Sequence, residues 1–331
     1  MKGRLAALVL AAIAAAGATT QAYLKLGVGV GNQMIALTWP EGPVRYRISN
    51  GVAGAVGPAQ LQAAAERAFN TWQDVDGASI TYEFAGFTDA QPDEENSDGL
   101  TTLGFLPRPD LDRVLASTSF TIDAVTGKLT EVDIFFNSTF EWSTASGGSP
   151  GRFDLESIAL HEIGHLGGLG HSAIGETELA GGGRVVRAAE TAMFPLAFNA
   201  GSIQGRTLRP DDIAGISDLY PVDSSETGSI SGRVTKNGAG VYGAHVVAFH
   251  LQTGALVGNF TLDSVGRFVI GALSPGPYLL RVEPLDDADP DSFFEESPPV
   301  DVDFRPAFFD RVVVVPSGGD SGSVTIRVVR K

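Results

Sequence analysis

The chain has 331 residues and no cysteine, and its 39 acidic residues exceed its 23 basic ones, giving a formal net charge of −16. The lack of cysteine excludes disulfides, thiolate metal sites and a cysteine nucleophile. So acidic a chain is a poor candidate for binding nucleic acid or an anionic membrane, because phosphate groups would repel it. Its length suffices for two domains.

The first residues have the pattern of a secretory signal peptide. Lys2 and Arg4 precede an apolar run over residues 5–16, and small residues follow. This run is too short to span a bilayer, which takes about 20 residues. We expect residues 1–22 to be removed by cleavage after Ala22, with Ala18 as the alternative, leaving an exported protein, extracellular or periplasmic, without a membrane span. The glycine-rich residues 23–37 are expected to form an arm or a short pro-segment.

The next segments predict strands and one helix. Residues 44–48 and 80–84 alternate apolar and polar side chains, the pattern of half-buried strands. Between them Gly57 and Pro58 open a helix, which ends before Asp76-Gly77. The apolar stripe of this helix consists of Leu61, Ala65, Ala68, Phe69 and Trp72.

Two further strands are expected at residues 114–120 and 131–137, joined by a turn at Thr126-Gly127. Residues 89–98 before them form an acidic stretch. A solvated loop is favoured there over a calcium site, because the stretch lacks the ligand spacing of an EF-hand.

Residues 161–171, HEIGHLGGLGH, carry the strongest chemical signal. We expect a helix from residue 155 to about residue 167, capped by Asp154. His161 and His165 then project from one helix face, with Glu162 beside them. Gly168 lets the chain turn back and bring His171 to the same point. Three neutral imidazoles leave one position of a tetrahedral Zn²⁺ open, as in catalytic sites.

Glu162 is expected to be the general base that activates a water molecule on this zinc. The alternative is a helix that buries histidines without a metal. Each of the three imidazoles would then need a separate hydrogen-bond partner.

The segment HEIGHLGGLGHS resembles the metzincin zinc peptidases, and Ser172 after the third histidine points to their matrixin branch. Residues 190–195 resemble the methionine turn of that family, with Met193 beneath the metal. The resemblance covers residues 39–220. It implies an α+β metzincin catalytic domain, with a twisted mixed sheet and three helices, that hydrolyses protein or peptide substrates.

The resemblance also implies a substrate site. In matrixins the strand corresponding to residues 114–120 pairs with extended substrate, and Leu115 and Ala116 resemble its Leu-Ala pair. Residues that follow the methionine turn build the wall of the main specificity pocket: Pro195, Leu196, Ala197 and Phe198. Ser117 and Phe135 stand where animal matrixins have structural-zinc histidines, so we expect one catalytic zinc rather than two. The absent cysteine also excludes cysteine-switch latency.

Residues 172–189 form a longer connection between the third histidine and the methionine turn than the resemblance implies, and Gly181-Gly182-Gly183 suggest a mobile insertion.

Residues 208–220 resemble the last matrixin helix, which Pro210 begins and Pro221 ends. Its expected buried stripe is Ile213, Ile216 and Tyr220. Asp211 and Asp212 either complement the helix dipole or, as one such aspartate does in some relatives, anchor the mature N-terminus.

The sequence pattern changes after the predicted first domain, which spans residues 23–222. A polar linker at residues 223–228 precedes short β-branched runs with glycine turns, which predict an all-β sandwich over residues 229–331. Its pattern resembles a carboxypeptidase-regulatory or transthyretin-like module. His245 and His250 are expected on a strand. Acidic residues gather at 286–303, where a surface loop is favoured over Ca²⁺ binding through Asp287, Asp289 and Asp291.

The sequence therefore predicts a secreted, monomeric zinc endopeptidase whose second domain binds a surface or a partner protein. One alternative is a binding protein that attaches to a surface or polymer and keeps a degenerate peptidase scaffold. The presence of Glu162 argues against this alternative, because a peptidase that has lost its activity can lose the general base and keep the zinc ligands. Another alternative is a peptidase that acts mainly on its own chain.

Overall fold

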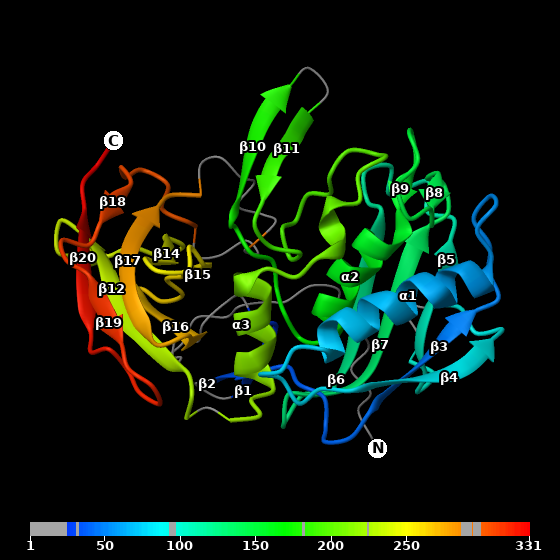
Figure 1. Ribbon diagram of the computed structural model, residues 1–331, viewed down its shortest axis with the longest axis horizontal. Helices are drawn as coiled ribbons and strands as arrows, with labels where there is room; N and C mark the ends of the chain where they lie inside the picture. Colours follow the sequence, from blue (N-terminus) through cyan, green and yellow to red (C-terminus); the bar gives the residue numbers. More distant parts are fainter. Residues whose placement is uncertain are drawn as a thin grey trace.

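The structure, a computed structural model, describes residues 25–30, 33–92, 97–180, 183–223, 225–285, 293 and 299–331. Figure 1 shows two bodies with helix α3 (Pro210–Leu219) between them. We call the body that contains the other two α-helices the first domain and the β-rich body the second domain. The predicted signal peptide and the acidic residues Asp287, Asp289 and Asp291 lie outside the described residues.

A five-stranded mixed sheet forms the frame of the first domain, in the order β4-β3-β5-β7-β6. Its strands are β3 (Val44–Ser49), β4 (Tyr82–Thr88), β5 (Thr101–Leu106), β6 (Ala116–Asp123) and β7 (Lys128–Asn137). Strands β4, β3, β5 and β7 are parallel, and β6 pairs antiparallel with β7 at the edge. The four predicted strands are confirmed. Strand β5 was not predicted, because it is nearly all buried and so lacks the alternation that marks a half-buried strand.

Two helices pack against this sheet and against each other (Figure 1). Helix α1 (Pro58–Gln73) buries the predicted stripe from Leu61 to Trp72. The Trp72 indole N–H donates to the Leu160 carbonyl at 2.8 Å, which ties α1 to helix α2 (Leu155–Leu166). This contact fixes the height of α2 over the sheet, and α2 carries the histidine motif.

The N-terminus of α2 is held as the sequence predicts. The Asp154 carboxylate accepts from the Ser157 backbone N–H at 2.9 Å, which caps the helix. Arg206 in the 3-10 helix η1 (Gln204–Arg206) donates to both oxygens of the same carboxylate, at 2.8 and 2.5 Å. A bidentate charged pair of this kind restrains both position and orientation.

Short elements surround this frame. They are the paired strands β1 (Gly27–Val30) and β2 (Gln33–Ala36), β8 (Trp142–Ser143) and β9 (Phe153–Asp154), and β10 (Gly175–Ala180) and β11 (Gly183–Ala189). The expected insertion is thus a β-hairpin, which projects at the top of Figure 1. The segment expected to be an arm or a short pro-segment contacts the end of α2, where the Leu26 N–H donates to the Gly168 carbonyl at 2.9 Å.

The second domain is a two-sheet β-sandwich. Its strands are β12 (Gly228–Lys236), β13 (Ala239–Gly240), β14 (His245–His250), β15 (Leu256–Phe260), β16 (Arg267–Leu273), β17 (Gly276–Glu283), β18 (Ala307–Phe308), β19 (Val313–Val315) and β20 (Val324–Val328). One sheet contains β13, β12, β16 and β20, and the other contains β15, β14, β17, β18 and β19. Both sheets contribute to one apolar core. The prediction that His245 and His250 lie on a strand is confirmed.

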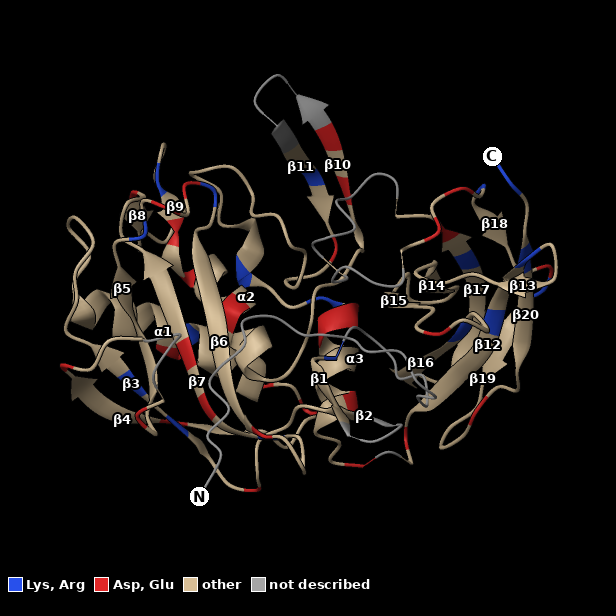
Figure 2. Cartoon of the chain, turned by 180° about the vertical axis from the view of Figure 1, so that it is seen from behind, with Lys and Arg blue, Asp and Glu red and all other residues tan. Residues whose placement is uncertain are grey.

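Helix α3 contacts both domains, and one part of its predicted stripe is wrong. Ile216 is fully buried in the core of the first domain, whereas Ala214 belongs to the core of the second. Ile213 is 42% exposed. The second domain covers the face with Asp211 and Ala214, so the side that carries Ile213 is left to solvent. Figure 2 shows acidic segments at both ends of this helix. Within the described residues, no helix is long and apolar enough to cross a membrane.

Candidate metal centre

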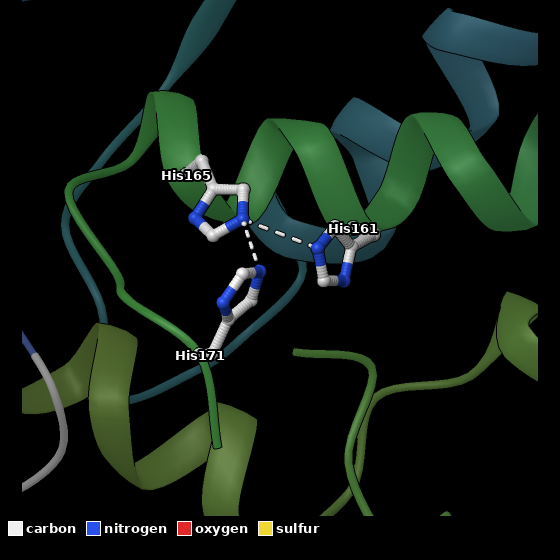
Figure 3. A group of neighbouring side chains, drawn as sticks. All are labelled: His161, His165 and His171. Atoms are coloured by element: carbon white, nitrogen blue, oxygen red, sulfur yellow. Dashed lines mark hydrogen bonds between the residues drawn. The ribbon is translucent and has the colours of Figure 1, made fainter. Parts of the chain in front are cut away.

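Three imidazoles converge on one point (Figure 3). His161 and His165 project from the same face of α2, and His171 comes from the loop that follows it. The Nε2 atom of His165 lies 3.1 Å from Nε2 of His161 and 3.2 Å from Nε2 of His171. Two nitrogens bound to one tetrahedral Zn²⁺ at about 2.0–2.1 Å stand roughly 3.3 Å apart. The spacing of the three rings therefore fits a zinc ion.

The other ring nitrogens indicate which tautomer is present. Nδ1 of His161 lies 2.8 Å from the Ala192 carbonyl, and Nδ1 of His165 lies 2.7 Å from the Leu169 carbonyl. A carbonyl only accepts, so each Nδ1 carries the proton and each Nε2 presents a lone pair. Lone pairs this close repel one another unless a cation lies between them. The donor set thus matches a metal site and not a hydrogen-bonded histidine cluster.

Burial favours the neutral form of His161 and His165. It lowers the pKa of His161, with the Ala192 carbonyl acting in the opposite direction. Burial also lowers the pKa of His165 well below its usual value, and the neighbouring His161 and His171 lower it further. Neutral imidazole is the form that binds metal.

Glycines allow the chain to return after α2. Gly168 has φ +96°, and a Cβ there would lie 2.4 Å from the Leu37 carbonyl oxygen, so both the backbone angle and the space require glycine. The Gly168 N–H donates to the His165 carbonyl at 2.7 Å and closes the last turn. His171 follows three residues later on the metal-facing side (Figure 3).

Met193 lies under α2, as the methionine-turn resemblance implies. It is 2% exposed, and its Sδ atom would stand 2.2 Å from a Cβ on Gly164. The turn is fixed by Asp212, whose carboxylate accepts from the Ala192 N–H at 2.8 Å, from the Met193 N–H at 3.1 Å and from the Thr191 hydroxyl. The sequence did not assign this role to Asp212, because nothing local links α3 to residues 191–193.

The same Asp212 carboxylate accepts from the Arg209 N–H at 2.8 Å and so caps its own helix. The dipole interpretation of the aspartate pair is therefore supported at Asp212. Anchoring of a mature N-terminus involves residues that precede the described part of the chain.

Glu162 lies next to the histidines in the same cleft. Its side chain is 6% exposed, and its Oε2 accepts from the Thr118 hydroxyl of β6 at 2.6 Å. Burial raises the pKa of Glu162 to about 7, although the Thr118 hydrogen bond acts to lower it. A carboxyl group with a pKa near neutrality can both take up and release a proton. Thr118 was not predicted as a site residue from the sequence, since only the folded sheet brings it to α2.

A cleft of about 830 Å³ runs past the three histidines. Leu115 and Ala116 line it at the start of β6, which is the edge strand of the sheet. The predicted pocket-wall residues, Pro195, Leu196, Ala197 and Phe198, also line it. The cleft therefore combines an open strand edge with an apolar wall, a suitable shape for an extended peptide.

Asn137 at the end of β7 shapes one rim of this cleft, a role that the sequence did not reveal. It is fully buried, and its Nδ2 donates to the carbonyls of Arg108, Leu111 and Val114. Its Oδ1 accepts from the Arg108 N–H at 3.1 Å. One side chain thus fixes the loop that leads into β6.

The sequence of this chain matches two known protein families. The family described as matrixin matches residues 38–221, more than half of the chain, and the chain belongs to the matrixins. The carboxypeptidase regulatory-like domain matches residues 229–286, within the second domain. The chain is therefore a matrixin joined to a carboxypeptidase regulatory-like domain.

One curated relative is Metalloendoproteinase 2-MMP of Arabidopsis thaliana. It is 29% identical over 182 residues, which cover 52% of this chain and 40% of the relative. The chain thus matches less than half of that protein's length.

Proposed function

We propose that this protein is a secreted zinc endopeptidase with His161, His165 and His171 as metal ligands and Glu162 as general base. The observation that carries the proposal is the convergence of three histidine Nε2 atoms beside a buried carboxyl group in a peptide-sized cleft. The matrixin match supports it independently. Secretion rests on the signal-peptide pattern of residues 1–22, and the proposed domain order is residues 23–222, a linker at 223–228 and residues 229–331.

A zinc ion on the three histidines would supply Lewis-acid polarisation of the scissile carbonyl and lower the pKa of a water molecule toward about 7. Glu162 takes the proton of the attacking water and then delivers it to the leaving amine. The Thr118 hydrogen bond holds one carboxylate oxygen and leaves the other for this exchange. Met193 packs under the ligand helix and takes no part in proton transfer.

The substrate is proposed to lie along β6. The outer edge of that strand has no partner strand in the described sheet, so a peptide can add to it through main-chain hydrogen bonds whatever its side chains. Leu115 and Ala116 lie at the start of this edge and line the cleft. The wall from Pro195 to Phe198 then receives one apolar side chain of the substrate.

The test compares wild type with Glu162→Ala, using casein cleavage and zinc content as separate measurements. We expect Glu162→Ala to retain zinc and to lose about 10²–10⁴-fold in cleavage rate, because general acid–base catalysis contributes that much. A chelator should abolish wild-type cleavage, and added zinc should restore it.

The matched control is Glu66→Ala, which removes an exposed glutamate from α1 and should cleave like wild type. Wild-type-like cleavage by Glu162→Ala would refute the mechanism. Zinc-loaded wild type without any peptidase activity would favour the degenerate-scaffold alternative.

A further inference from the structure

The second domain contacts the first domain next to the third histidine. Asp211 of α3 is 3% exposed, and its Oδ1 accepts from the Gly258 backbone N–H of β15 at 2.8 Å. The same carboxylate accepts from the hydroxyl group of Ser172. One buried carboxylate therefore joins a strand of the second domain to the residue that follows His171.

Ser172 is also tied to the methionine turn. Its backbone N–H donates to the Met193 carbonyl at 2.9 Å, while its hydroxyl is directed to Asp211. The segment that presents His171 is thus held from two sides. One attachment lies within the first domain, and the other leads through Asp211 to Gly258.

The apolar packing follows the same path. Ile174 is 5% exposed, and its Cδ1 would lie 3.2 Å from a Cβ on Gly258. The same Cβ would lie 2.7 Å from Nε2 of His245, so β15 has no room for a side chain here. The Phe293 ring, also from the second domain, lies 6.2 Å from the His171 ring. The second domain therefore covers the outer side of residues 171–174.

His171 needs more restraint from its surroundings than the two histidines on α2. His161 and His165 are fixed by a regular helix, whereas His171 follows a stretch with glycines at 167, 168 and 170. Glycine loses more conformational freedom on folding than any other residue, so this ligand is the costliest of the three to hold in place. Groups that orient a metal ligand from outside typically change metal affinity or activity 10–100-fold.

We propose that the docked second domain is a working part of the zinc site. Gly258 fixes Asp211, Asp211 fixes Ser172, and Ser172 orients His171 toward the other two ligands. Asp211 and Gly258 are positioning residues that act through Ser172. The inference rests on the proposed function for the identity of the metal.

The test uses the full chain and measures zinc affinity by competition with a chromogenic chelator. In Gly258→Ala the new methyl group would lie 2.7 Å from Nε2 of His245 and 3.2 Å from Cδ1 of Ile174, so β15 must shift at its contact with Asp211 and Ile174. We therefore expect zinc affinity to fall at least about tenfold. The matched control is Gly319→Ala in the same domain, where a Cβ meets only the Pro316 Cγ at an ordinary 3.4 Å. This control should bind zinc like wild type.

Ser172→Ala tests the same chain of contacts, even if Gly258→Ala does not fold. Ser172→Ala removes the hydroxyl within the first domain and should also lower zinc affinity about tenfold. Because both changes break one chain of contacts, the double variant should bind zinc no more weakly than the worse single variant. Native zinc affinity in a folded Gly258→Ala, native affinity in Ser172→Ala, or additive losses would each overturn the proposal.

The results of these zinc-affinity measurements do not depend on whether the protein cleaves peptides. Zinc affinity is measured without any substrate. A wild-type protein that binds zinc tightly and cleaves nothing would refute the peptidase proposal, and the dependence of zinc affinity on Gly258 would still be decided by the same titration.

Discussion

Burial raises the pKa of Asp211 to about 7, and its neighbour Asp212 raises it further, while hydrogen bonds from Ser172 and the Gly258 amide act to lower it. Its ordinary value is 3.8. At pH values between 3.8 and about 7, the Asp211 carboxyl group binds more protons in the folded state than in the unfolded state. The stabilising contribution is therefore fully present below about pH 4 and is lost as the pH rises to about 7.

Asp211→Asn should remove this dependence. As the pH rises from 4 to 7, we expect the metal-free variant to lose less free energy of unfolding than metal-free wild type does. Urea denaturation at a series of pH values measures both curves, and other buried carboxyl groups cancel in the difference. Parallel curves would show that Asp211 does not titrate in this range.

At the residue scale, local spacing determined how much could be predicted. His161 and His165 were found because a helix places residues four apart on one face, and Gly168 indicated the return of His171. Thr118 and Asn137 could not be found in this way. Their partners lie far away in sequence, at α2 and in the loop before β6, and a single sequence contains no signal for such contacts.

At the scale of the element, α2 depends on a close approach that overrides helix propensity. Alanine is favoured over glycine inside a helix by about 1 kcal/mol. At Gly164, however, a Cβ would lie 2.2 Å from the Met193 Sδ and 2.8 Å from Cζ2 of Trp72. Overpacking a dense core typically costs about 1–3 kcal/mol, so the clash outweighs the gain in propensity.

Gly164→Ala should therefore lower the melting temperature and displace Met193 from beneath the ligands. Thermal unfolding followed by circular dichroism measures the first effect. Gly147→Ala is the matched control, because a Cβ at Gly147 has no atom within 4 Å. A Gly164→Ala variant more stable than wild type would mean that α2 and the methionine turn pack less closely than the structure shows.

The elements themselves were predictable where one face is buried. Strand β3 and helix α1 show clear period-two and helical patterns, and the structure confirms both. Strand β5 is buried almost throughout and carries no such pattern. The hairpin β10–β11 was expected only as an insertion, because Gly181-Gly182-Gly183 suggested a mobile segment and not a turn between paired strands.

At the scale of the whole molecule, the two domains share α3 and should unfold together. Ala214 lies in the core of the second domain, while Ile216 two residues later lies in that of the first. At the far end of the helix, Oδ1 of Asp218 would lie 3.1 Å from a Cβ on Gly271 of β16, in the second domain. An interface this close to both cores couples their stabilities.

The three tryptophans, Trp39, Trp72 and Trp142, all belong to the first domain, so their fluorescence reports that domain alone. Far-UV circular dichroism reports both domains. We expect the two thermal transitions to coincide in wild type and to separate in Ala214→Asp, which places a charge in the shared interface. Separate transitions in wild type would contradict coupling of the domains.

The interface could not have been predicted from the sequence. A helix between two domains buries polar and small residues on one side, and Asp211 and Ala214 look like surface positions when only one domain is considered. For the same reason the sequence placed Ile213 in the core. Each domain was recognisable by itself, but their packing depends on surfaces that no local pattern marks.

The most direct test of the account is X-ray absorption at the zinc edge on the purified full chain, together with its metal content. We expect one zinc per chain, coordinated by three imidazole nitrogens at about 2.0–2.1 Å. His171→Ala should lose one of these imidazoles from the spectrum. A protein that takes up no stoichiometric zinc, or a zinc whose spectrum contains no imidazole, would contradict the convergence of His161, His165 and His171 on one ion.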